Sequence, residues 1–138
     1  MRRVLIVGVV LVTALLLPLA AAARTPATYT SPDCLHLQIR PTEIVFACGD
    51  GTYYVNHLSW RSWHKSRATG LGVFHQNDCQ PNCATGTFHQ RRGRLVLRNR
   101  TWCSGLHKYA FKGAYVRYNS PLLGELETTF RILLPLRC

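Results

Sequence analysis

Two cysteines stand four positions apart in the stretch NDCQPNCATG, with a histidine on either side. Cys79, Cys83, His75 and His89 are residue types that zinc accepts as ligands. A strong zinc signal carries two closely spaced ligand pairs, however, and this stretch supplies only one. Thioredoxin-like redox chemistry needs two residues between the cysteines and a helix start, whereas Pro81 predicts a turn. The residues therefore favour a structural disulfide over a metal site or a redox site.

The chain holds six cysteines, namely Cys34, Cys48, Cys79, Cys83, Cys103 and Cys138. An even number in a small exported chain predicts three disulfides, because thiols oxidise outside the cytosol. Alternating strand direction is expected to bring four of them to one end of a sheet, while the terminal cysteine clamps the tail. Many connectivities remain open, and the simplest is 48–79, 83–103 and 34–138. No cofactor is predicted.

Histidines could also do acid–base chemistry, and the chain has six. A ribonuclease needs two such groups flanking a phosphate, with an arginine to hold the developing charge. His57 and His75 are the candidates, provided that their strands are paired neighbours. Asp50 and Asp78 are better explained as turn residues. Because the sequence contains neither G-x-S-x-G nor H-E-x-x-H, a non-catalytic protein is favoured over an enzyme.

The densest charge lies in HQRRGRLVLRNR, which contains Arg91, Arg92, Arg94, Arg98 and Arg100. On a strand, Arg94, Arg98 and Arg100 would share one face, the two leucines between them would take the other, and Arg92 would lie in a turn. This basic stripe suits a polyanion: an anionic cell-wall polymer, a membrane surface or, less favoured, nucleic acid. The alternative is a solvated edge strand whose charges prevent aggregation.

The elements that position these residues follow an export signal. Two arginines precede a long apolar run, and three alanines follow it. This pattern predicts a signal peptide over residues 1–23, cleaved between Ala23 and Arg24. The alternative is an uncleaved anchor, because the apolar run approaches the ~20 residues that span a bilayer. Pro18 and the small residues favour cleavage, so the protein is expected to be secreted.

Cleavage leaves 115 residues, with 15 Lys and Arg against 6 Asp and Glu, a net charge of +9. This length fits one domain. Residues 24–33 hold two prolines and no apolar periodicity, and are expected to be a disordered leader. Residues 34–138 are expected to form a single disulfide-bonded β domain.

Short β-rich runs separated by Gly, Pro and Asn fill this domain. TEIVFAC and TYYVNHLSW predict a hairpin across Gly49–Gly51, since Asp-Gly favours the positive φ of a tight turn. GLGVFHQ, HKYAFKGAYVRY and ETTFRILL predict further strands, and TGTFHQ with RLVLRN predicts a second hairpin around Arg91–Gly93. Only residues 59–68 could form a short helix. The expected fold is all-β: a small antiparallel sandwich or barrel-like domain stapled by disulfides.

Trp60 and Trp63 flank Arg61. We expect them to pack over a small core. The alternative is an exposed platform for a sugar, a membrane or a protein partner. In a strand they would face opposite sides, whereas in a helix they would share one.

Three motifs together resemble a family of small exported proteins from high-GC Gram-positive bacteria. They are IVFACGDGTYYVNHLSWRSW, ATGLGVFHQNDCQPNCATG, and a later cysteine with a tyrosine-bearing strand, spanning roughly residues 41–118. The family has no assigned activity, so no catalytic residue is carried over. The resemblance implies export and a compact cysteine-bonded domain. Cys34 and Cys138 lie outside the matching region, so it leaves their pairing open.

Taken together, the sequence predicts a secreted, monomeric, disulfide-stabilised protein without catalysis that binds anionic cell-envelope polymers. The alternative is a small basic secreted hydrolase such as a ribonuclease.

Overall fold

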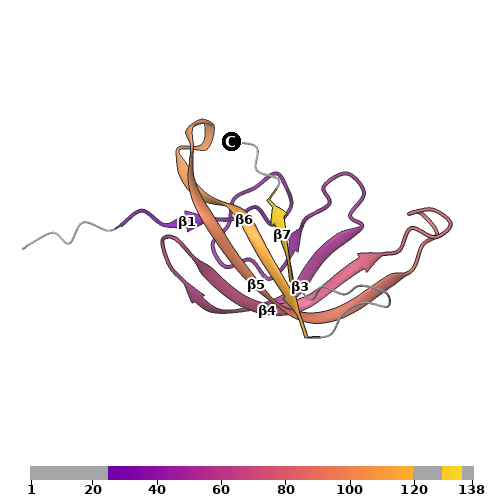
Figure 1. Ribbon diagram of the computed structural model, residues 1–138. Coiled ribbons are helices and arrows are strands. Elements are labelled where there is room, and N and C mark those ends of the chain that lie inside the picture. The colour runs from indigo at the N-terminus through magenta and orange to yellow at the C-terminus, as the bar shows by residue number, and fades with distance from the viewer. Residues whose placement is uncertain (1–24, 120–128, 135–138) are drawn as a thin grey trace, which may run out of the picture.

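Long strands with alternating burial form one curled sheet in the computed structural model (Figure 1). The structure describes residues 25–119 and 129–134, so the predicted signal peptide lies outside the described residues. The elements in chain order are β1 (Thr28–Tyr29), β2 (Ile44–Val45), β3 (Tyr53–Trp63), β4 (Ala68–Asn77), β5 (Phe88–Cys103), a 3₁₀ turn η1 (Ser104–Leu106), β6 (Lys108–Tyr118) and β7 (Thr129–Leu133).

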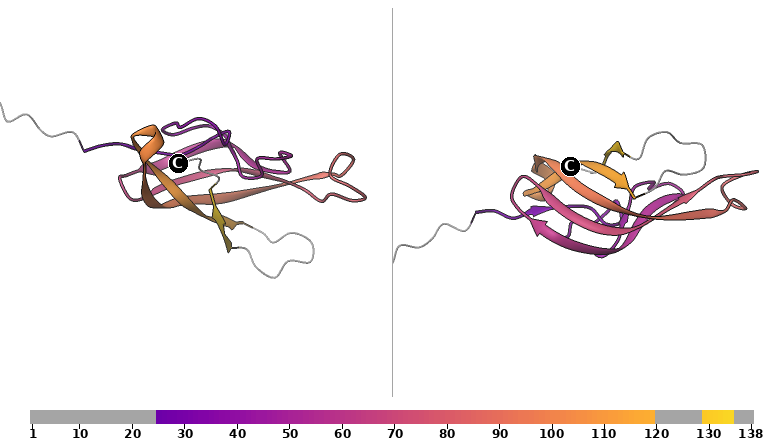
Figure 2. Two further views of the ribbon diagram at one scale, coloured as in Figure 1. Left: turned by 90° about the horizontal axis from the view of Figure 1, so that it is seen from above. Right: turned by 60° about the horizontal axis from the view of Figure 1, so that its bottom comes forward.

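The seven strands follow the order β1-β6-β5-β4-β3-β2, with β7 also paired to β6. Every pairing is antiparallel except that of β1 with β6, which makes the sheet mixed. The sheet curls into a half-barrel, as the two further views in Figure 2 show. The predicted all-β, barrel-like, disulfide-bonded fold is therefore confirmed.

The hydrophobic core lies on the inner face of the curl. Its largest fully buried side chains include Phe74, Phe111, Ile44, Leu95 and Leu97. Ile44 comes from the N-terminal segment, which crosses the open side of the sheet. The predicted hairpin across residues 49–51 is confirmed, because β2 and β3 pair in antiparallel register.

Strand β5 corrects the prediction of a second hairpin around Arg91–Gly93. It is one strand of 16 residues, and Gly93 pairs with Gly72 on β4. A Cβ at Gly93 would lie 2.9 Å from the carbonyl oxygen of Arg117 and 3.1 Å from the Phe74 ring. The glycine is therefore explained by close packing on the inner face rather than by a turn.

Two further predictions about local structure are wrong. Residues 59–63 belong to β3 and residue 68 begins β4, so 59–68 is not a helix. The leader 24–33 is ordered in part, because β1 pairs with β6 and Thr30 forms an isolated bridge with Gln38. Thr28 and Thr30 are fully buried. The local periodicity of the sequence does not predict this burial, because it depends on pairing with distant residues.

Trp60 and Trp63 pack against the core, as expected, although they lie on a strand. A register shift between Trp60 and Ser62 changes the alternation, so both indoles face inward and meet edge-to-face at 4.6 Å between ring centroids. Their ring N–H groups donate to backbone carbonyls of Pro41 and Thr28. The indoles are therefore engaged inside the molecule, which does not favour an exposed tryptophan platform.

The disulfides differ from the predicted wiring. Cys34 bonds to Cys48 and Cys79 bonds to Cys83, so 48–79, 83–103 and 34–138 are all wrong. Cys103 is also disulfide-bonded. The wrong position expected for Cys103 follows from β5: one continuous strand carries Cys103 to the end of the sheet opposite the 79–83 loop (Figure 1). The expectation that Cys79 and Cys83 are disulfide-bonded is confirmed, within their own loop.

Candidate functional site

The outer face of the curled sheet gathers arginines. Arg92, Arg94 and Arg98 on β5 are exposed, while the alternate residues Leu95 and Leu97 are buried on the inner face. Arg94 pairs with Arg117 on β6, and β7 adds the exposed Arg131 opposite Tyr115. We call this set the arginine face: Arg92, Arg94, Arg98, Arg117 and Arg131.

Two of the five predicted arginines lie elsewhere. Arg91 is buried, with its guanidinium 3.6 Å from the Tyr118 ring centroid and a hydrogen bond of 3.0 Å to Gln76. Arg100 lies opposite the buried Phe111, packs over Tyr109 and donates to Thr28. Both side chains therefore support the packing of the domain rather than the outer row.

The prediction that Arg94, Arg98 and Arg100 share one face is wrong for Arg100. Asn99 has a left-handed backbone conformation with φ of 58°, which interrupts the alternation between Arg98 and Arg100. The prediction that Arg92 lies in a turn is also wrong, because Arg92 pairs with Val73 in the middle of the sheet. Arg92 thereby joins the outer row that Arg100 leaves.

Sequence reasoning missed Arg117 and Arg131. Arg117 belongs to the alternating run AYVRY. This alternation could have placed its side chain on the face of the strand opposite to that of the buried Val116. Which strand lies beside β5, however, is a tertiary fact that the local pattern does not contain. The pairing of β6 with both β5 and β7 brings these two arginines to the row on β5.

No carboxylate of the described residues lies within ion-pair distance of the arginine face. The ion pairs formed among the described residues join His36 to Asp33 and His89 to Asp78, and none of them involves the arginine face. The hydrogen bond from His89, together with backbone N–H groups of Thr87 and Gln80, lowers the pKa of Asp78 to about 2. Asp78 thus organises the loop after β4, as predicted for a turn residue, and the arginine face has no carboxylate partner among the described residues.

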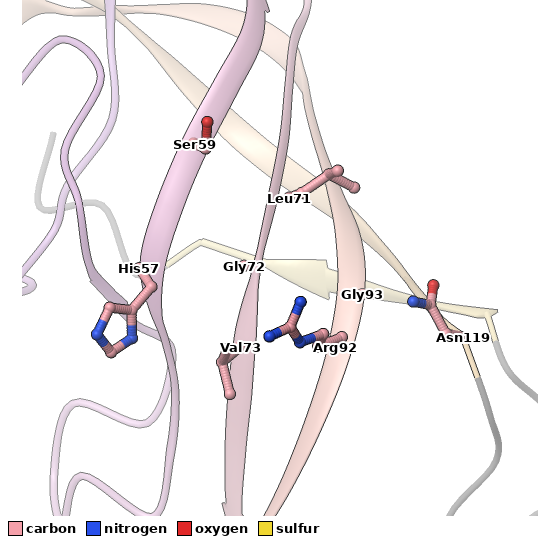
Figure 3. Close-up of a pocket in the computed structure, with 8 residues that line it drawn as sticks. All are labelled: His57, Ser59, Leu71, Gly72, Val73, Arg92, Gly93 and Asn119. Carbon is pink, nitrogen blue, oxygen red and sulfur yellow. The ribbon is translucent and has the colours of Figure 1, made fainter.

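Two open grooves run across the outer face. The larger has a volume of about 550 Å³ and is lined by His57, Ser59, Leu71, Gly72, Val73, Arg92, Gly93 and Asn119 (Figure 3). The smaller, of about 240 Å³, is lined by Arg67, Arg94, Val96, Arg98, Tyr115, Val116, Arg117 and Thr129. The grooves are neighbours, because Leu71 of the first pairs with Arg94 of the second. Anionic groups along a polymer could therefore enter both.

The structure brings His57 and His75 together. They lie on β3 and β4, which are paired neighbours, and this was the condition for the two histidines to meet. Nδ1 of His57 lies 2.8 Å, and Nε2 of His75 3.0 Å, from the same Oδ1 of Asn56. His75 is buried and stacks on Tyr54, whereas His57 is exposed. Burial, and next the nearby His57, lower the pKa of His75. The buried His75 therefore favours the neutral ring and holds the Asn56 side chain, whereas the exposed His57 lies at the groove.

Within residues 25–119 and 129–134, no cluster of three or more His, Cys, Asp or Glu side chains could hold a metal ion. No helical segment in that part of the chain has the length and hydropathy of a membrane span.

The chain matches no family profile, no curated protein and no solved structure.

Proposed function

We propose that the protein is secreted and binds an anionic cell-envelope polymer, such as a teichoic-acid-like poly(glycerol phosphate), through the arginine face. The observation that carries the proposal is the row Arg92, Arg94 and Arg98, extended by Arg117 and Arg131, without a carboxylate partner among the described residues. Guanidinium groups suit phosphate oxygens because they offer a rigid fork of donors.

The position of β5 supports this proposal over the solvated-edge alternative. Charges that protect a sheet from aggregation are needed on an edge strand. β5 lies between β4 and β6: residues 88–97 pair with β4 and residues 93–103 pair with β6. Arg94 therefore has a strand on both sides, and so does its partner Arg117, which pairs with β5 and with β7. Arg94 and Arg117 therefore guard no free edge, and a ligand is the better explanation for the concentration of arginines around them on one face.

Export is part of the proposal. The N-terminal signal pattern supports it, and so do the bonded cysteines, because disulfides persist in oxidising compartments. The net positive charge that remains after removal of residues 1–23 would draw the protein toward an anionic cell surface. Binding to this surface would need only a monomer.

Retention on immobilised poly(glycerol phosphate) tests the proposal. The outer-face variant carries Arg94→Ser, Arg98→Ser and Arg117→Ser. The control variant removes three exposed cations that line neither groove, through Arg40→Ser, Lys65→Ser and Lys112→Ser. We expect the wild type and the control to elute at similar salt concentrations and the outer-face variant to elute much earlier. Equal elution of the two variants would mean that only net charge matters, and would contradict the proposal.

Parallel columns carrying RNA, or vesicles with an anionic lipid, identify the polyanion. Stronger retention on either than on poly(glycerol phosphate) would contradict the choice of a cell-wall polymer.

A further inference from the structure

His57 is held in an unusual backbone conformation at the edge of the larger groove. Its φ is 51°, in the left-handed region, where β3 shifts register against β4 between Asn56 and Ser59. Non-glycine residues seldom adopt this conformation, and such strain is often concentrated at functional sites. The irregularity leaves the imidazole exposed on the groove instead of continuing the regular alternation of the strand.

Asn56 fixes which nitrogen of His57 carries the proton. An amide oxygen accepts hydrogen bonds and donates none, so Nδ1–H of His57 and Nε2–H of His75 both donate to Oδ1 of Asn56. The neutral His57 ring then presents an unprotonated Nε2, which is a proton acceptor. A neutral acceptor does not pair with a phosphate anion, but it does accept the proton of a hydroxyl group.

The same groove also holds the groups that a phosphodiester needs. Arg92 from β5 lines it with His57 from β3, and Figure 3 shows the Arg92 side chain extending from β5 toward β4, beside Val73. The hydroxyl of Ser59 and the amide of Asn119 lie along the same lining. A volume of about 550 Å³ is within the usual range for small-ligand sites.

We infer that this groove cleaves a phosphodiester that has a hydroxyl group on the neighbouring carbon, by transphosphorylation. RNA has this chemistry through its 2′-hydroxyl, and unsubstituted poly(glycerol phosphate) has it through the central glycerol hydroxyl. The inference rests on the proposed binding of an anionic polymer by the arginine face, and it goes beyond it by assigning a reaction.

The step is an internal displacement at phosphorus. Nε2 of His57 takes the hydroxyl proton, and the oxygen forms a bond to phosphorus while the bond from phosphorus to the leaving oxygen breaks. Arg92 holds the charge that develops on the phosphoryl oxygens. The leaving oxygen takes a proton from water, and the hydroxide left behind is neutralised by the imidazolium of His57. The products are a cyclic phosphodiester and an alcohol, and no oxidation occurs.

Asn56 and His75 are positioning residues in this account. Asn56 holds the tautomer of His57, and His75 holds Asn56 from the buried side.

The test is an assay for cyclic phosphate ends on polyuridylate and on unsubstituted poly(glycerol phosphate), with single-stranded DNA as the substrate that lacks the hydroxyl. His57→Asn is the informative variant, because asparagine tolerates the left-handed conformation and the fold is expected to survive. His107→Asn is its matched control: His107 has φ of 49°, is exposed and lines neither groove. Thermal unfolding of each variant checks that the fold is retained.

We expect the wild type and His107→Asn to cleave at least one of the two hydroxyl-bearing polymers and to leave DNA intact. His57→Asn should be slower by at least about 100-fold, the lower end of the usual contribution of a general base. Cleavage of only one polymer would identify the source of the ligand. Equal rates for His57→Asn and His107→Asn, cleavage of DNA, or no cleavage at all would overturn the inference.

Retention on the polymer column separates the two proposals. A wild type that is retained through the arginine face but cleaves neither polymer overturns the reaction and leaves the binding intact. A wild type that is not retained contradicts the proposed function.

Discussion

Asn56 is a junction at which two histidine rings meet on a single oxygen atom. Burial, and next the nearby His57, lower the pKa of His75 below the ordinary value for histidine, so the folded protein favours the neutral ring. The unfolded chain would then bind a proton at His75 that the folded protein excludes. Where the unfolded chain binds more protons, the free energy of unfolding increases with pH.

His75 should therefore make the protein less stable in mild acid. As the pH falls through the ordinary histidine pKa of about 6.5 toward the lowered pKa of His75, the stability that the neutral ring provides is progressively lost. His75→Gln keeps a side-chain donor for Asn56 but does not titrate. We expect the fall in melting temperature between pH 7.5 and 5.5 to be smaller in His75→Gln than in the wild type. Identical pH dependence in the two proteins would contradict this account of the buried ring.

At the scale of the elements, the two described disulfides constrain rings of different size. Cys34–Cys48 closes a ring of 15 residues that joins the N-terminal segment to the β2–β3 hairpin, whereas Cys79–Cys83 closes a ring of five. In the chain-entropy model these rings contribute about 3 and about 2 kcal/mol to the free energy of unfolding. The small loop is also held by Asn77, which accepts from the Cys79 N–H and donates to the Cys83 carbonyl.

We therefore expect Cys34→Ser/Cys48→Ser to be less stable than Cys79→Ser/Cys83→Ser. Urea unfolding of the two double variants measures the difference directly. The reverse order would show that the 79–83 loop, rather than the N-terminal cover, holds the sheet together.

Most strands could be predicted from the sequence, because their β-rich runs alternate and are punctuated by Gly, Pro and Asn. The Asp-Gly turn before β3 and the runs that became β4, β6 and β7 are examples. The prediction fails in β5. Arg91–Gly93 has the composition of a turn, but Gly93 is required because a side chain there would collide with Phe74 and Arg117. A turn there would reverse the chain after Gly93, which is why the expected position of Cys103, and its pairing with Cys83, are wrong.

The candidate site could be predicted only in part, for a related reason. Local alternation places Arg94 and Arg98 on one face and marks His57 and His75 as candidates on adjacent runs. It does not reveal left-handed residues such as His57 and Asn99, which change the side on which later residues emerge. Nor does it reveal that Asn56 lies between the two histidines, because that depends on the register of β3 against β4.

At the scale of the whole molecule, the curled sheet separates two roles. Its inner face holds the aromatic and aliphatic core under the N-terminal segment, and its outer face carries the arginines and both grooves. Gly72 and Gly93, paired across β4 and β5, let the inner face pack tightly behind the larger groove. The larger groove is therefore backed by a closely packed inner face.

The salt dependence of binding to poly(glycerol phosphate) is the sharpest test of whether the polymer binds the arginine face. Each cation that neutralises a phosphate makes the slope of log K against log salt steeper, by roughly 0.7 per contact on a flexible single strand of nucleic acid. Removing Arg94, Arg98 and Arg117 should therefore reduce the slope by about 2, while the Arg40, Lys65 and Lys112 control keeps the wild-type slope. Equal slopes in the wild type and the outer-face variant would show that the polymer does not bind the arginine face.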